Sequence, residues 1–112
     1  MRALPRPRFE ELVADALDGL PEGIGFSNVV VVVEDEQRGQ SDLLGLYQGV
    51  PLTERQHYTG ALPDRITVFR LPLCRHARDL DDLVHQVRVT VMHEFGHHVG
   101  LDEDRLHRLG WA

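Results

Sequence analysis

The stretch from Asp79 to Gly100 constrains the fold more than any other part of this sequence. Its apolar side chains recur every three or four residues, at Leu80, Leu83, Val84, Val87, Val91 and Phe95. This spacing places them on one face of an α-helix. Asp79 is a suitable N-cap, and Gly100 suits a left-handed residue at the C-terminal end. The sequence therefore predicts one long amphipathic helix, against which the rest of a small domain must pack.

Three shorter segments predict strands. The run of five valines within Phe26–Glu34 is typical of a strand covered on both faces. Arg65–Leu71 alternates between two sides and stops before Pro72, and the mixed polarity of one side favours a position near a sheet edge. Leu43–Tyr47 is a third, shorter candidate.

Helical segments are also expected near both ends of the chain. An N-terminal helix is predicted by the apolar spacing of Phe9, Leu12, Val13, Ala16 and Leu17, and residues 1–8 before it are expected to be flexible. A short C-terminal helix is predicted from Asp102 to Leu109, with Leu106 and Leu109 directed toward the core. A chain of 112 residues has room for one domain. We therefore expect a single α+β domain over residues 1–112, with a small mixed sheet packed on the long helix.

Charge and composition argue against several classes of partner. The chain has 18 acidic and 12 basic residues, which gives a formal net charge of −6. This charge disfavours binding to nucleic-acid phosphates or to an anionic membrane surface. No apolar run reaches the roughly 18 residues needed to span a bilayer, and the first residues lack the apolar stretch of a secretory signal. We expect a cytoplasmic protein with no nucleic-acid or membrane partner, in which the single cysteine, Cys74, is a small buried residue.

Five residues inside the long helix, His93-Glu94-Phe95-Gly96-His97, form an HExxH motif. Helical geometry places the two histidines about 40° apart around the axis and one turn apart along it. Two imidazoles in this arrangement can bind one tetrahedral Zn²⁺. Glu94 lies too far around the helix to share in ligation, but it can reach a metal-bound water and act as a general base. In a chain rich in His and Glu, an inert pair of histidines beside a glutamate is the alternative interpretation of these five residues.

Residues that follow the motif strengthen the interpretation as a metal site. Gly100 lies three residues after His97, and Glu103 lies six after it. HExxHxxG followed by a ligand three residues later is the extended zinc-binding pattern of the metzincins, which have a histidine where this chain has Glu103. The neighbouring Asp102 and Asp104 are alternative third ligands. Stabilisation of the last helix's dipole, without metal contact, is the alternative role of Glu103.

The sequence around this motif resembles a known family, the minimal zincin-like metallopeptidases. Val91–Trp111 is similar to the family's C-terminal signature, and Leu43–Leu52 and Leu62–Leu73 are similar to its upstream segments. The resemblance covers most of the chain, from about Phe9 to Trp111. It implies a reduced zincin fold, with a short sheet and an active-site helix, and a zinc site of the HExxHxxGxxD type.

The resemblance also implies the roles of individual residues. His93 and His97 take the positions of zinc ligands, Glu94 that of the catalytic carboxylate, and Glu103 that of a third ligand that is more often Asp. We therefore expect a zinc-dependent peptidase that hydrolyses a peptide or protein substrate. Zincins lay their substrate along an edge strand, and the candidate strand here carries Ile66, Thr67, Val68 and Phe69. A non-catalytic binding or regulatory module with the same fold, with a structural metal or none, is the alternative function.

Other side chains are weighed as additional parts of the site. His98 projects about 100° away from His97 into the apolar arc, and it is expected to be buried and hydrogen-bonded. His107 is a candidate fourth ligand or transition-state donor, or a plain surface histidine. Tyr47 and Tyr58 are candidate donors to a transition state, and spacing selects neither of them.

Overall fold

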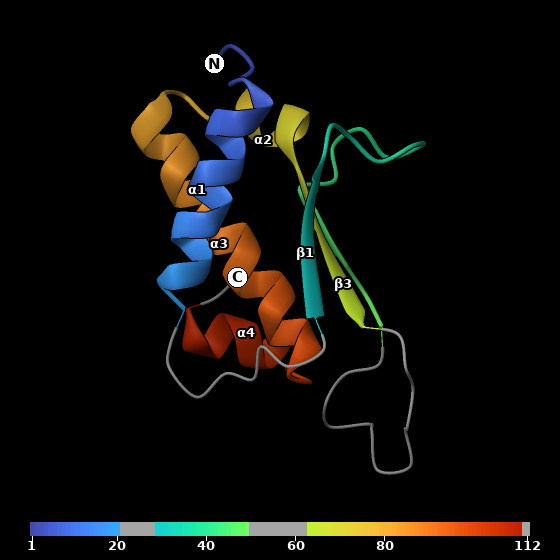
Figure 1. Ribbon diagram of the computed structural model, residues 1–112. Helices are drawn as coiled ribbons and strands as arrows, with labels where there is room; N and C mark the ends of the chain where they lie inside the picture. Colours follow the sequence, from blue (N-terminus) through green and yellow to red (C-terminus); the bar gives the residue numbers. More distant parts are fainter. Residues whose placement is uncertain (21–28, 50–62, 111–112) are drawn as a thin grey trace.

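The computed structural model describes residues 1–20, 29–49 and 63–110 (Figure 1). In chain order the elements are α1 (Arg6–Asp18), β1 (Val29–Glu34), β2 (Gly45–Gln48), β3 (Asp64–Phe69), α2 (Arg70–His76), α3 (Leu80–His98) and α4 (Glu103–Leu109). The strands form a mixed sheet in the order β1–β3–β2, in which β3 is parallel to β1 and antiparallel to β2. The α+β fold expected from the sequence, with a small mixed sheet and one long helix, is confirmed.

Helices α1 and α3 lie side by side and pack on the sheet (Figure 1). The apolar face of α3 is fully buried at Leu83, Val87, Val91 and Phe95, whereas Leu80 at its first turn is exposed. Asp79 caps the helix as predicted, because its side chain accepts a hydrogen bond from the backbone N–H of Asp82 at 2.8 Å. The core between α3, α1 and the sheet therefore fixes the position of the HExxH segment, which forms the C-terminal part of α3.

The position of β3 contradicts two sequence-based predictions, namely that this strand lies near a sheet edge and that it pairs with the substrate. β3 is the central strand, paired with β1 on one side and with β2 on the other. Its main-chain hydrogen-bonding groups are used within the sheet, and its side chains from Ile66 to Phe69 are buried. The prediction that Ile66, Thr67, Val68 and Phe69 form an edge strand for substrate is therefore wrong.

β1 also differs from its prediction, because only one of its faces is packed against the core. Val30 is exposed and the other valines of the run are half-buried or nearly so. The first three residues of the predicted strand, 26–28, lie outside the described residues. A continuous apolar run indicated burial on both faces, but Val29, Val31 and Val33 pack against the core from one face, whereas Val30 on the opposite face is exposed.

Three local features were not expected. Helix α2 begins directly after β3, and Pro72 lies in its first turn, where a missing backbone N–H is tolerated. Leu106 of α4 is buried, but Leu109 is exposed, so only one of the two leucines expected in the core lies there. Residues 1–8 were expected to be flexible, but the amino group of Met1 donates to the carbonyls of Cys74 and Ala77 at 3.1 and 2.8 Å.

None of the described helices has the length and apolar character of a membrane span.

Candidate metal centre

Three side chains from α3 and α4 meet at one point. The Nε2 atoms of His93 and His97 lie 3.2 Å apart. Oε1 of Glu103 lies 3.2 Å from Nε2 of His93 and 3.1 Å from Nε2 of His97. A tetrahedral ion with bonds of 2.0–2.1 Å separates its ligand atoms by about 3.3–3.4 Å, so this nearly equilateral triangle fits one zinc ion. His93, His97 and Glu103 therefore form a candidate metal centre.

The turn between α3 and α4 brings Glu103 to the histidines. Gly100 has a positive φ of 94°, and the backbone N–H of Leu101 donates to the carbonyl of Gly96 at 2.8 Å. Gly96 then accommodates Leu106, because a Cβ at Gly96 would collide with the Leu106 side chain. Helix α4 thus folds back across the end of α3 (Figure 1), with Glu103 at its first position.

The acidic neighbours of Glu103, Asp102 and Asp104, are not part of the candidate metal centre. The Asp102 side chain caps α4 by accepting a hydrogen bond from the backbone N–H of Arg105 at 2.8 Å. Asp104 is exposed and, like Asp102, is not part of the cluster. Among the described residues, Glu103 is the acidic side chain whose carboxylate meets both histidines. His107, weighed as a fourth ligand, is an exposed residue of α4 outside the cluster.

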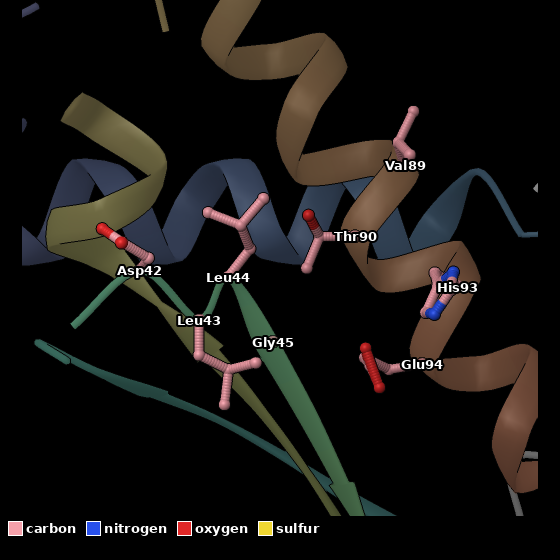
Figure 2. A pocket seen from close by; sticks show the side chains of 8 residues that line it. All are labelled: Asp42, Leu43, Leu44, Gly45, Val89, Thr90, His93 and Glu94. Carbon is pink, nitrogen blue, oxygen red and sulfur yellow. The ribbon is translucent and has the colours of Figure 1, made fainter. Parts of the chain in front are cut away.

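Glu94 lies next to the histidines and is nearly buried, at 8% exposure. Burial raises the pKa of its carboxyl group, because the charged form loses solvation; the nearby His93 and His97 oppose this effect, and Glu103 adds to it. The side chain projects from α3 toward the segment that leads into β2 (Figure 2). A carboxylate with a raised pKa beside a candidate metal centre has the environment of a general base.

A pocket of about 360 Å³ lies between α3 and the start of β2 (Figure 2). Its walls are mostly apolar, and the motif residues His93 and Glu94 contribute ionisable groups to it. The complete lining is Asp42, Leu43, Leu44, Gly45, Val89, Thr90, His93 and Glu94. Gly45 allows β2 to come close to α3, since a Cβ there would lie 2.7 Å from Cγ2 of Thr90 and 3.2 Å from Cγ of Glu94. Sequence reasoning missed this pocket, because its two walls are more than 40 residues apart along the chain.

A hydrogen-bonded polar trio, with two of its three members buried, lies on another side of α3. The His98 ring is fully buried, and its Nδ1 lies 2.7 Å from Oδ2 of Asp64, as expected for a buried, hydrogen-bonded histidine. The hydroxyl of Tyr47 donates to the same oxygen at 2.6 Å. Asp64 was not singled out from the sequence, where an Asp before a strand is typical of a turn. Tyr58 lies outside the described residues.

Comparison with known families identifies the family of this chain. The family described as zincin-like metallopeptidase matches residues 26–111, about three quarters of the 112-residue chain. The matched range contains the whole sheet, α2 to α4, and the cluster of His93, His97 and Glu103. A comparison with curated proteins gave no match.

Proposed function

Because the chain belongs to the zincin-like metallopeptidase family, we propose that it is a zinc-dependent peptidase in which Glu94 acts as the general base. In this proposal His93, His97 and Glu103 hold the zinc ion. The observation that carries the proposal is the meeting of three ligand atoms, 3.1–3.2 Å apart, beside a nearly buried carboxylate. Family membership supports a peptidase, and the cluster indicates where its chemistry would take place.

The donor set suits zinc and a hydrolytic reaction. Two imidazoles and one carboxylate are typical of catalytic zinc sites, which keep a position open for substrate or water. With two neutral histidines and one carboxylate, the occupied site has a net charge near +1, which favours an anionic transition state. When bound, zinc supplies Lewis-acid polarisation of the scissile carbonyl and makes the attacking water more acidic.

Glu94 provides the proton transfers. Its carboxylate accepts a proton as the water oxygen bonds to the carbonyl carbon, and it then donates that proton to the leaving nitrogen as the C–N bond breaks. The products are one carboxylic acid and one amine. Burial raises the pKa of Glu94, so its carboxylate is a stronger base than that of an exposed glutamate.

Strand β2 replaces β3 as the proposed substrate strand. Among the described strands β2 lies at the edge of the sheet. It packs against α3, and the residues that lead into it form one wall of the pocket beside Glu94. An extended peptide can pair with such an edge through its main chain and place one side chain in the pocket. The apolar lining contributed by Leu43, Leu44 and Val89 favours an aliphatic side chain.

The substitution Glu94→Gln tests the proposal. Because the amide cannot accept the proton, we expect peptide turnover to fall by about 10²–10⁴-fold while zinc remains bound. Glu11→Gln, the same change at an exposed position of α1, serves as the matched control and should leave turnover unchanged. A zinc-loaded parent protein that cleaves no member of a diverse peptide library would contradict the proposal and favour the non-catalytic alternative.

A further inference from the structure

We propose that a hydrogen-bonded trio, the half-buried Tyr47 and the buried Asp64 and His98, positions the histidine ligands by joining the last turn of α3 to the strand beside the site. The three residues come from β2, β3 and α3, which are separate in the sequence. This inference rests on the proposed zinc site, but it does not depend on peptidase activity.

The trio is held by two short hydrogen bonds, of which the bond between Asp64 and His98 is buried. Oδ2 of Asp64 accepts from the Tyr47 hydroxyl at 2.6 Å and lies 2.7 Å from Nδ1 of His98. Asp64 is 1% exposed and His98 is fully buried. Burying a carboxylate in this way is unfavourable unless its hydrogen bonds are made. Apolar side chains of similar volume often stabilise a core equally well, so this polar trio is better explained by the fixed geometry that it imposes.

The His98 ring has one defined orientation. Its Nε2 atom is buried and has no hydrogen-bond partner among the described residues. Because Oδ2 of Asp64 already accepts from Tyr47, Nδ1 of His98 is the donor in the bond that joins the ring to this carboxylate. The ring also makes edge contacts with Tyr47 and Phe95, each with centroids 6.0 Å apart. The bond to Asp64 and these two contacts together fix the ring.

The position of His98 transmits this constraint to the metal centre. His98 directly follows His97, and in a rigid helix a rotation that moved one would move the other. On another side of the same turn, Gly96 packs against Leu106 of α4, which carries Glu103. The last turn of α3 is therefore held by the trio and by α4, and the two histidine ligands lie between these contacts.

Gly49 restricts Asp64 from the end of β2. Its φ is +153°, and a Cβ at this position would collide with Oδ1, Cγ and Cβ of Asp64. The close approach of the backbone leaves the Asp64 carboxylate little room to move. Metal affinity depends on ligand placement to within about 0.5 Å. Contacts that restrict movement of the end of α3 should therefore increase the affinity for zinc.

The test measures zinc affinity, by competition with a chromophoric chelator, in matched variants of the whole chain. His98→Leu removes the hydrogen bond, and we expect the dissociation constant for zinc to rise about 10–100-fold. His98→Asn keeps a donor near the position of Nδ1, and its affinity should stay within about threefold of the parent's. Tyr47→Phe removes a single hydroxyl from the trio and should weaken zinc binding by about threefold or more.

Val87→Ala serves as the control for a general loss of stability. Val87 is fully buried in α3 but lies six residues, about 9 Å along the axis, before His93. A folded Val87→Ala protein should bind zinc as the parent does. Parent-like affinity in His98→Leu and Tyr47→Phe, or an equal loss in Val87→Ala, would overturn the inference. If His98→Leu fails to fold, Tyr47→Phe decides alone, and a parent that binds no zinc would instead overturn the proposed metal site on which the inference rests.

Discussion

At the scale of single residues, Glu94 combines an ionisable group with a nearly buried position in the C-terminal part of α3. Its carboxylate loses most of its solvation, and the pKa of the group is raised as a result. Such an arrangement disfavours the folded state whenever the group is ionised. Functional residues commonly reduce stability in this way, since reactivity requires an environment that a structural residue would avoid.

The cost of ionising Glu94 predicts a pH dependence in the metal-free protein. Because the folded-state pKa is raised, the folded state binds the proton more tightly than the unfolded state does. The stability of the parent relative to Glu94→Gln should therefore be greatest at low pH and fall as pH rises from the ordinary glutamate pKa through the raised one. Thermal unfolding of both proteins in chelator across this pH range measures the difference. Parallel curves of stability against pH for the two proteins would contradict the raised pKa of Glu94.

The residues of the site differ in how well their roles could be predicted from the sequence. His93, Glu94 and His97 could be predicted because one helix places them, and helical geometry follows from their spacing. Glu103 could be predicted as one of three acidic candidates, but only the cap at Asp102 and the packing of α4 separate it from its neighbours. Asp64 and Tyr47 could not be predicted, because their partner His98 lies 34 or more residues away along the chain.

At the scale of elements, the junction between α3 and α4 positions Glu103, the proposed third ligand. Glu103 is the first residue of a seven-residue helix whose buried apolar anchor is Leu106. This anchor fits against Gly96, inside the HExxH motif itself. The second variable position of the motif is therefore constrained by packing, although HExxH as a metal-binding pattern leaves it unspecified.

The substitution Gly96→Ala tests the role of this junction. Alanine favours the helix by about 1 kcal/mol over glycine, but its Cβ would collide with Leu106 and displace α4. We expect zinc affinity to fall at least about tenfold as Glu103 moves away. Overpacking by about 1–3 kcal/mol, offset by the gain in helix propensity, leaves a net loss of stability of about 0–2 kcal/mol. Gly19→Ala, at the end of α1 where a Cβ meets only ordinary contacts, is the control. Parent-like zinc binding by Gly96→Ala would refute this role.

The elements themselves were predictable to different degrees. The helices α1, α3 and α4 were predicted because each has a clear apolar period or a capping residue. Helix α2 was not predicted, because Pro72 indicated the end of the preceding strand and not the first turn of a seven-residue helix. The order β1–β3–β2 was also not predictable, because the pairing of strands depends on long-range packing that leaves little trace in a six-residue pattern. This is why the edge strand was assigned to β3 instead of β2.

At the scale of the whole molecule, the candidate metal centre joins α4 to the body of the domain. The remainder of α4 is mostly exposed, and Leu106 is its one buried side chain among the described residues. A domain of 112 residues has a modest core, and a metal that bridges two of its elements adds stability to the folded state alone. In this proposal the zinc ion would stabilise the fold as well as take part in catalysis.

Removal of zinc should lower the melting temperature of the protein. A ligand present at 100 times its dissociation constant stabilises the folded state by about 2.7 kcal/mol. For a domain of this size, the loss corresponds to a fall in melting temperature on the order of 10 °C. Calorimetry with and without a chelator measures the shift. His97→Ala should melt at the same temperature under both conditions, and a chelator effect of equal size in that variant would show that the shift has another origin.

The most direct test of the central claim is the metal content of the protein, purified without a histidine tag and equilibrated with zinc. Elemental mass spectrometry of the parent should find about one zinc ion per chain, and His97→Ala should have lost it, since one of three protein ligands is removed. The same stoichiometry in the parent and in His97→Ala would place the zinc elsewhere. An absence of zinc from the parent would contradict the metal centre and the peptidase function proposed from it.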